Sequence, residues 1–317
     1  MKIQGNIITV GLAPAWDLTC QGNHLDWGDH PVLKDQHLVA AGKALNVSRA
    51  LAWLGRESIA SGWWGQDDFA QMQTHLVQTC PRIRTHMTPV KGATRINVTV
   101  LDLAQHRELH LRAQSSLASP IAFKSLQKDL QKNAQTNTVT VLAGALPDAS
   151  YTNQVLALAR SCHQAPATGL VADSHGPVFN SLVQAGLPWL IKPNVTELSE
   201  LLGTPIPNRV SSLLKAARTL THRVPNILIS RGKHGALLVT SDQAWQGQCL
   251  TRGRVISTVG CGDYLLAGYL YGLTKYTQPK TALALALKIA TARAWAWTHE
   301  KTWATTKKQI QVQVKAL

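Results

Sequence analysis

The chain has 317 residues, 45% of them hydrophobic and 15% charged, which is enough to bury a large core in one big α/β domain or in two domains. Its formal charge of +15 favours anionic partners, but Lys and Arg are spread along the sequence without a basic tail, so nucleic acid is not the expected partner. No stretch reaches the roughly 20 continuous apolar residues of a membrane span. The five cysteines are scattered and lack CxxC spacing, which argues against a disulfide framework and a zinc site. We therefore expect a protein of the reducing cytoplasm.

Strands and helices are predicted to alternate along most of the chain. The first apolar run, "NIITVGL" (6–12), is short and soon broken by Pro14, so it is interpreted as a strand rather than a signal peptide. Other short, β-branched runs predict strands at 138–144, 169–174, 188–194, 226–232 and 235–240. Helical spacing of apolar residues predicts helices at 44–55, 67–78, 151–162, 196–203 and 211–220. This order indicates an α/β fold, with a mainly parallel sheet covered by helices on both faces.

Two regions interrupt the alternation with polar, strand-like sequence and no helix between the strands. They run from about 14 to 40 and from about 90 to 113, and they predict a small separate β-sheet that acts as a discontinuous lid on a single domain spanning 1–317. Near the end, "TALALALKIATARAWAW" (281–297) predicts a long alanine-rich helix that is buried on more than one side.

The stretch "STVGCGDYLLAGYL" (257–270) places an acid inside a glycine turn at the start of an apolar helix. Gly260 and Gly262 leave backbone N–H groups unobstructed, and the helix dipole adds partial positive charge, so this turn should attract anions. Asp263 in such a place can serve as the base of a phosphoryl transfer, or it can simply cap the helix. Walker, dinucleotide-binding and HExxH motifs are absent from the sequence.

Several further segments occur in an order and spacing similar to those of one enzyme family. They are "AAGKALNVSRALAWLG" (40–55), "TRINV" (94–98), "AGALP" (143–147), "KPNVTEL" (192–198), "ISRGKHGALLV" (229–239) and "STVGCGD" (257–263). Together they resemble the ribokinase-like, pfkB-type carbohydrate kinases over nearly the whole chain, from Ile7 to about Ala294, and within that family the 1-phosphofructokinases most, with the tagatose-6-phosphate kinases close by. The resemblance implies a ribokinase-like three-layer α/β/α domain with a β-sheet lid, ATP and Mg²⁺ as cofactors, a phosphorylated sugar as substrate, and a homodimer formed through the lid.

The resemblance also implies roles for individual residues. Asp263 would be the catalytic base, and the anion hole would consist of Gly260, Cys261 and Gly262. ATP would contact Ser230, Gly232, Lys233, Gly235 and Lys192, with adenine between this hairpin and the 281–297 helix. Substrate would contact Asp17, Gly42, Lys43, Asn46 and Arg95, with Arg107 as a further candidate for the sugar phosphate. Asn194 and Glu197 would arrange magnesium indirectly, through water or phosphate.

Each of these residues also has a purely structural interpretation. Lys192 can end a strand, Glu197 can compensate a helix dipole, and Arg95 can face solvent. The glycines of "ISRGKHG" suit an ordinary hairpin turn, which is compatible with the nucleotide role.

The expected reaction is phosphorylation of fructose 1-phosphate to fructose 1,6-bisphosphate. The chain departs from the family pattern at Ala13, Ala44, Thr99 and Cys261. Ala13 and Thr99 lie on the predicted sugar side, so other acceptors remain open: tagatose 6-phosphate, fructose 6-phosphate, or an unphosphorylated sugar or nucleoside. The alternative from a different class is a catalytically weak relative that binds sugar phosphate, although a pure binder would have no need of Asp263.

Overall fold

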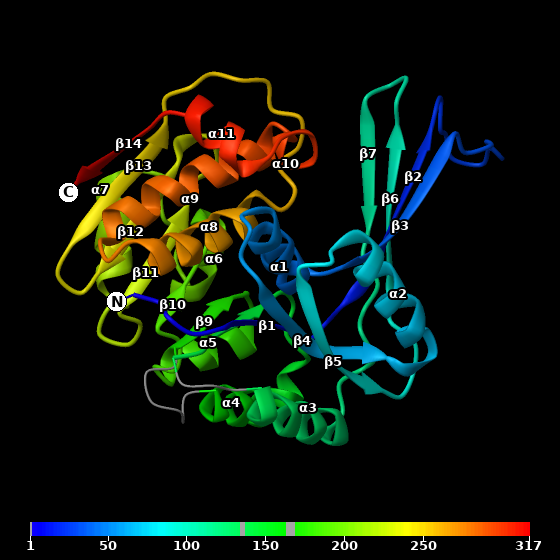
Figure 1. Ribbon diagram of the computed structural model, residues 1–317, viewed down its shortest axis with the longest axis horizontal. Coiled ribbons are helices and arrows are strands. Elements are labelled where there is room, and N and C mark those ends of the chain that lie inside the picture. Colours follow the sequence, from blue (N-terminus) through cyan, green and yellow to red (C-terminus); the bar gives the residue numbers. More distant parts are fainter. Residues whose placement is uncertain (1, 134–136, 163–168) are drawn as a thin grey trace.

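The computed structural model describes residues 2–133, 137–162 and 169–317, and within them the strands form two separate sheets (Figure 1). The main sheet has ten strands in the order β14-β13-β12-β11-β10-β9-β8-β1-β4-β5. Its strands are β1 (Ile7–Gly11), β4 (Ser58–Gly65), β5 (Ile83–Val90), β8 (Val139–Ala143), β9 (Gly169–Asp173), β10 (Leu190–Ile191), β11 (Asn226–Ser230), β12 (Ala236–Thr240), β13 (Ala244–Cys249) and β14 (Val312–Ala316). The seven strands from β5 to β11 pair in parallel, and β12, β13 and β14 extend the sheet in antiparallel fashion. The predicted mainly parallel sheet is confirmed.

Helices cover both faces of the main sheet, which gives the three layers expected from the sequence. They are α1 (Lys43–Trp53), α2 (Phe69–Thr79), α3 (Pro120–Asn133), α4 (Thr152–Ser161), α5 (Pro177–Gln184), α6 (Val195–Leu202), α7 (Val210–Arg218), α8 (Cys261–Lys275), α9 (Pro279–Ala294), α10 (Trp297–Glu300) and α11 (Trp303–Gln309). One hydrophobic core joins α1, α8 and α9 to one face, and two others join α3 to α7 to the opposite face. None of the helices in the described residues is both long and apolar enough to cross a bilayer.

Close packing of α8 on α9 depends on glycine. A Cβ at Gly268 would lie 2.8 Å from the Cα of Ala286, and one at Gly272 would lie 2.7 Å from the Cα of Ala282. Only the absence of a side chain lets the two backbones approach this closely. The contact fixes α8, which begins in the glycine turn at 257–263, against the alanine-rich helix.

The small sheet consists of β2 (Ala15–Gly22), β3 (Asp35–Ala41), β6 (Ile96–Asp102) and β7 (Arg107–Leu111), in the order β3-β2-β6-β7. It projects from the main body next to α2 (Figure 1). The four strands fall in the two segments predicted for it, except that β3 runs one residue further, to Ala41, and Val90 belongs to β5 of the main sheet.

Asp68 connects the small sheet to the main body. Its carboxylate accepts hydrogen bonds from the indole N–H groups of Trp16 in β2 (2.6 Å) and Trp64 in β4 (2.5 Å). It also accepts one from the backbone N–H of Thr94, just before β6 (2.8 Å). One acid therefore holds both segments of the small sheet at the edge of the main sheet.

A C-terminal segment, residues 297–317, packs against the part of the chain that precedes the glycine turn at 257–263. Strand β14 pairs with β13. Ile310 is fully buried and belongs to the same hydrophobic cluster as Trp295. The backbone of Gln311 accepts a hydrogen bond from the N–H of Leu250 (2.8 Å) and donates one to the Oγ1 of Thr251 (2.7 Å). These contacts hold the residues directly after β13.

The structure differs from the sequence-based prediction at the alanine-rich helix. This helix ends at Ala294 rather than continuing to residue 297, because Ala296 adopts a left-handed conformation (φ 59°) before the short helix α10 begins. Nothing in the alanine-rich pattern marks that turn.

Candidate active site

We call the glycine turn at 257–263 the catalytic turn, after the role predicted for it. Gly260 lies in this turn directly before α8, with φ at 77°. A positive φ is costly for residues with a Cβ, so glycine suits this position. Three residues later, Asp263 lies in the first turn of α8, only 5% exposed. Its Oδ2 accepts a hydrogen bond from the side-chain amide of Asn46 in α1 (2.8 Å). The carboxylate is thus held in the first turn of a helix by the side chain of Asn46.

Two lysines and a buried aspartate lie beside this turn. Asp173, at the end of β9 and fully buried, is 3.3 Å from the Nζ of Lys43 and 3.3 Å from the Nζ of Lys192. Lys192 is itself 4% exposed, and a Cβ at Gly262 would lie 3.1 Å from its ammonium nitrogen. Asp173 therefore holds two cations next to the turn, where they can bind the charged groups of a phosphorylated ligand.

Burial and the neighbouring charges set the pKa values in this cluster. Burial, together with the charge of Asp173, raises the pKa of Asp263 to about 6, although the Asn46 hydrogen bond and both lysines oppose the shift. Burial lowers the pKa of Lys43, but the charges of Asp173, Glu197 and Asp263 outweigh it, so the net shift is upward and the lysine stays charged. A base with a pKa near 6 is ionised at neutral pH and still accepts a proton readily.

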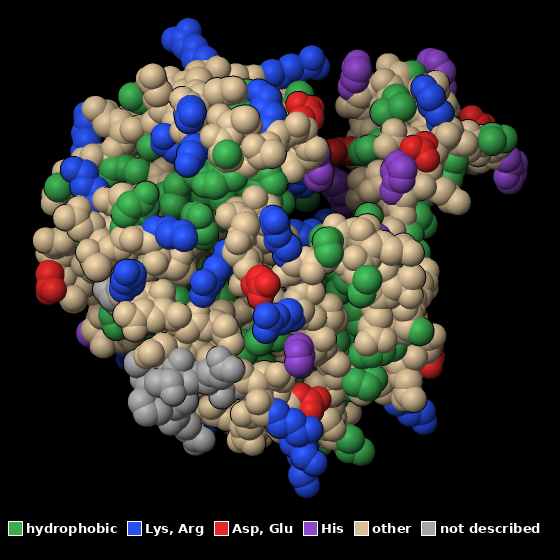
Figure 2. Space-filling model, viewed as in Figure 1, with side chains coloured by type: hydrophobic (Ala, Val, Ile, Leu, Met, Phe, Trp, Pro, Cys, Tyr) green, Lys and Arg blue, Asp and Glu red, His purple; other side chains and the backbone are tan. Residues whose placement is uncertain are grey.

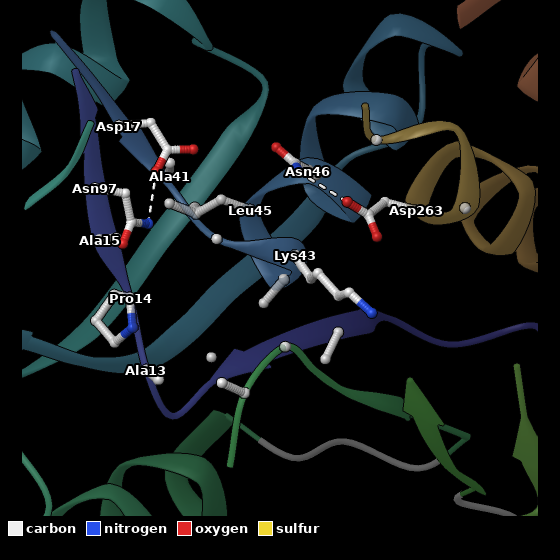
Figure 3. A pocket seen from close by; sticks show the side chains of 18 of the residues that line it. Ala13, Pro14, Ala15, Asp17, Ala41, Lys43, Leu45, Asn46, Asn97 and Asp263 are labelled. Atoms are coloured by element: carbon white, nitrogen blue, oxygen red, sulfur yellow. Dashed lines mark hydrogen bonds between the residues drawn. The ribbon is translucent and has the colours of Figure 1, made fainter. Parts of the chain in front are cut away.

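A cavity of about 710 Å³ opens between the small sheet and the main body, next to Asp263. Figure 2 shows the surface hollowed between these two parts of the molecule. Figure 3 shows Asp17 and Asn97 of the small sheet on one side of this cavity, and Asn46 and Asp263 on the other. Asn97 donates its side-chain amide to the Oδ1 of Asp17 (2.8 Å). We call this space the first cavity.

Two arginines lie at the small-sheet end of the first cavity. The guanidinium of Arg95 donates to the carbonyl oxygens of Pro14 (3.2 Å), Ala13 (2.9 Å) and Ala113 (2.6 Å). Arg112 is 56% exposed, and its guanidinium is 3.8 Å from the Oδ1 of Asp17. Arg95 is therefore largely occupied in holding loops, whereas Arg112 presents its donors to the cavity.

A second cavity of about 750 Å³ lies on the other side of the catalytic turn. Its walls come from the β11–β12 hairpin, the residues after β13, and helix α9. Its lining includes Gly232, Lys233, Gly235, Thr251, Cys261, Ala290, Thr291, Ala294 and Trp295. Asn194, Ser230 and Gly262 line both cavities, so the two spaces meet at the turn that carries Asp263.

Asn194 and Glu197 form a capping box at the start of α6. The side chain of Asn194 accepts from the backbone N–H of Glu197 (2.8 Å), and Glu197 accepts from the backbone N–H of Asn194 (2.8 Å). The other carboxylate oxygen of Glu197 is 3.9 Å from the Nζ of Lys43. In the described part of the chain, no three His, Cys, Asp or Glu side chains are arranged to hold a metal. These donors fit an ion such as Mg²⁺ that takes most of its ligands from phosphate and water.

The model of the family described as "pfkB family carbohydrate kinase" matches residues 9–295. The chain belongs to this family. The kinase is 31% identical over 282 residues to 1-phosphofructokinase of Vibrio cholerae, a match that covers 84% of this chain and 82% of the relative. It is 28% identical over 284 residues to 1-phosphofructokinase of Haemophilus influenzae, covering 88% of each chain.

Solved structures show the same fold for this kinase. Phosphofructokinase-2 from Escherichia coli, in complex with fructose-6-phosphate, matches with a TM-score of 0.86 at 20% identity, covering 96% of this chain and 97% of that one. A possible 1-phosphofructokinase from Thermotoga maritima matches with a TM-score of 0.78 at 19% identity, covering 98% and 100%. The predicted ribokinase-like fold is confirmed.

Apart from the further candidate Arg107, every site residue predicted from the sequence of this kinase lines at least one of the two cavities. The first cavity is lined by Asp17, Gly42, Lys43, Asn46, Arg95, Lys192, Glu197, Gly260 and Asp263, the second by Gly232, Lys233, Gly235 and Cys261, and both by Asn194, Ser230 and Gly262. The structure thus brings these residues together, while their individual roles stay predictions.

Two side chains considered on the sugar side lie elsewhere. Arg107 lines neither cavity, because it lies 3.7 Å from Asp102 and donates to the carbonyl oxygen of Leu25 (3.2 Å). The Oγ1 of Thr99 is hydrogen-bonded to His110 (3.0 Å) and is also outside both linings.

Sequence reasoning missed Asp173, Arg112 and Asn97. Asp173 ends a predicted strand, and the carboxyl ends of parallel strands are where ligands bind, so its position was a usable signal. Asn97 lies inside the "TRINV" segment, two residues after Arg95. Arg112 had no such signal, because it follows the last strand of the small sheet without any motif.

Proposed function

We propose that this kinase transfers the γ-phosphoryl group of ATP to the primary hydroxyl of a sugar phosphate, with fructose 1-phosphate as the preferred acceptor. The observation that carries the proposal is the place of Asp263, a buried base with a pKa near 6 at the junction of two large cavities. One cavity holds the acceptor and the other the nucleotide, so the two reacting groups meet at the turn.

In the proposed reaction, Asp263 accepts the proton of the acceptor hydroxyl as its oxygen attacks the γ-phosphorus, and the bond to the β–γ bridging oxygen breaks to release ADP. The backbone N–H groups around Gly260 and Gly262, at the N-terminus of α8, stabilise negative charge on the transferred group. Lys43 and Lys192 neutralise further phosphate charge. A magnesium ion bound to the nucleotide would add charge neutralisation, with Glu197 and Asn194 holding its water ligands.

The far end of the first cavity suits a polar, phosphorylated acceptor. Asp17 and Asn97 together offer a carboxylate and an amide for sugar hydroxyls. Arg112 offers a guanidinium that can bind phosphate through two parallel hydrogen bonds. Since Arg95 is held by three carbonyl oxygens, we assign the main phosphate contact to Arg112 rather than to Arg95.

The function is tested by ADP release with MgATP and, in turn, fructose 1-phosphate, tagatose 6-phosphate, fructose 6-phosphate and free fructose. We expect the largest kcat/KM with fructose 1-phosphate. A preference for either 6-phosphate would keep the kinase assignment and overturn the acceptor. If no acceptor stimulates release, the chain is a sugar-phosphate-binding relative rather than an enzyme of this reaction.

Replacement of Arg112 by Ala is expected to raise KM for the phosphorylated acceptor by about ten- to a hundredfold, because a charge-assisted contact to phosphate is lost. KM for ATP should not change. Arg107→Ala is the matched control, since Arg107 lies on the same sheet outside both cavities. Unchanged acceptor KM in Arg112→Ala, measured by steady-state kinetics, would exclude this residue from phosphate binding.

We also propose that two copies pair through their small sheets. Three apolar side chains that are more than a third exposed lie on one face of this sheet, opposite the face of Asp17 and Asn97: Ile96, Leu109 and Leu111. Pairing would cover them together with the open strand edges. Among the solved relatives, one is described as the tetrameric inhibited form of phosphofructokinase-2 from Escherichia coli.

Ile96→Glu is expected to convert such a dimer into monomers, because it places a charge in the apolar contact. Light scattering after size-exclusion chromatography measures the mass directly. A wild-type chain of about 34.5 kDa in solution would contradict the proposed pairing.

A further inference from the structure

The guanidinium of Arg293 lies next to the catalytic turn, and its Nε is buried although the residue as a whole is partly exposed. Arg293, near the end of α9, approaches Gly260 so closely that a Cβ at Gly260 would lie 3.4 Å from its Nε. Its guanidinium carbon is 5.5 Å from the centre of the Tyr264 ring, one residue after Asp263. Arg293 lines neither cavity, so it approaches the turn from outside the two spaces that would hold the ligands.

The charge of Arg293 has no acidic partner among the described residues, since no carboxylate oxygen there lies within 4.0 Å of its guanidinium nitrogens. One Nη donates to the Nε2 of His299 (2.7 Å), while its Nε is buried and has no hydrogen-bond partner in the same residues. Burial, together with the charge of Arg293, lowers the pKa of His299, although Glu300 opposes the shift, so His299 is a neutral acceptor here. A cation whose Nε is buried without a partner is stabilised by negative charge that develops nearby.

We infer that Arg293 is a positioning residue for phosphoryl transfer, whose fixed positive charge strengthens the anion hole at Gly260–Asp263. The inference rests on the proposed function, because the negative charge with which Arg293 interacts is the charge that develops on the transferred phosphoryl group. The low-dielectric layer between them, made by the turn and Tyr264, screens this interaction less than water would. The backbone amides of the turn and the dipole of α8 also stabilise negative charge there, so the charge of Arg293 adds to their effect.

The charge of Arg293 has a second effect that does not depend on catalysis. Burial raises the pKa of the Cys261 thiol, with Asp263 acting in the same direction and Arg293 in the opposite one. Cys261 lines the second cavity and can be reached by a small alkylating reagent. The pH dependence of its alkylation therefore reports whether the cation influences the turn.

The test compares wild type with Arg293→Met and Arg293→Lys. We expect Arg293→Met to lower kcat by about tenfold with little change in acceptor KM, and Arg293→Lys, which keeps the charge, to recover most of the rate. Alkylation of the Cys261 peptide, followed by mass spectrometry, should shift to higher pH in Arg293→Met and return toward wild type in Arg293→Lys. Thermal unfolding of each variant shows that the fold is intact.

Three results would overturn the inference. Wild-type kcat in a folded Arg293→Met variant would show that the charge is not used. A lower kcat without a shift in Cys261 alkylation, or without rescue by Lys, would indicate a structural role instead. Failure of the wild type to phosphorylate any acceptor would overturn the proposed function, and this inference with it. The first two results are distinguished from this one because in them the wild type is active.

Discussion

Asp263→Asn is expected to lower kcat by about a thousandfold, while the protein remains folded and binds both substrates. The amide keeps the size of the side chain and can still accept the hydrogen bond from Asn46, but it cannot take a proton from the acceptor hydroxyl. Steady-state rates of ADP release with saturating MgATP and acceptor measure the loss. An Asn variant within tenfold of wild type would show that Asp263 is not the base.

The same substitution should stabilise the fold, which separates loss of the base from unfolding. The native pKa of Asp263 is about 6, above its ordinary 3.8, so its contribution to stability is present below pH 3.8 and is lost as the pH rises through 6. At pH 8 the ionised carboxylate therefore costs stability, and Asn should raise the free energy of unfolding by up to about 3 kcal/mol. The wild-type rate should fall as the pH drops through 6, since the base becomes protonated.

Asp173→Asn is the second substitution with a large expected effect. It leaves two lysine ammonium groups, each 3.3 Å away, without their buried counter-charge, and breaking a buried pair in this way costs about 3–5 kcal/mol. Chemical denaturation measures the loss. Glu57→Gln is the matched control, because the Glu57–Arg84 pair is more than 60% exposed on both sides and should contribute less than about 1 kcal/mol.

Asp173→Asn should also change the pH profile of the reaction. The charge of Asp173 raises the pKa of Asp263, so its removal lowers that pKa and moves the acid limb of kcat below pH 6. An acid limb that stays in place would show that the two carboxylates are not coupled.

The glycine turn, the strand–helix order and the small sheet could be predicted because each depends on residues that are close together in the sequence. Strand β4, "SIASGWWG", was not predicted, because its serines and glycines interrupt the apolar run that identifies a buried strand. The coupling of Asp173 to Lys43 joins residues 130 positions apart, and only the order of strands in the sheet brings them together. Family motifs located the cavities, but they could not reveal that Arg95 is occupied by backbone carbonyls while Arg112 is available.

The C-terminal segment gives the two halves of the site a different history during synthesis. The ribosome releases β1, the small sheet and α1 early, but the first cavity is complete only when the turn that carries Asp263 has followed them. The residues after β13, which form a wall of the second cavity, make their hydrogen bonds with Gln311 only when the segment before β14 has emerged. During synthesis the wall of the second cavity is therefore the later of the two to be held in place.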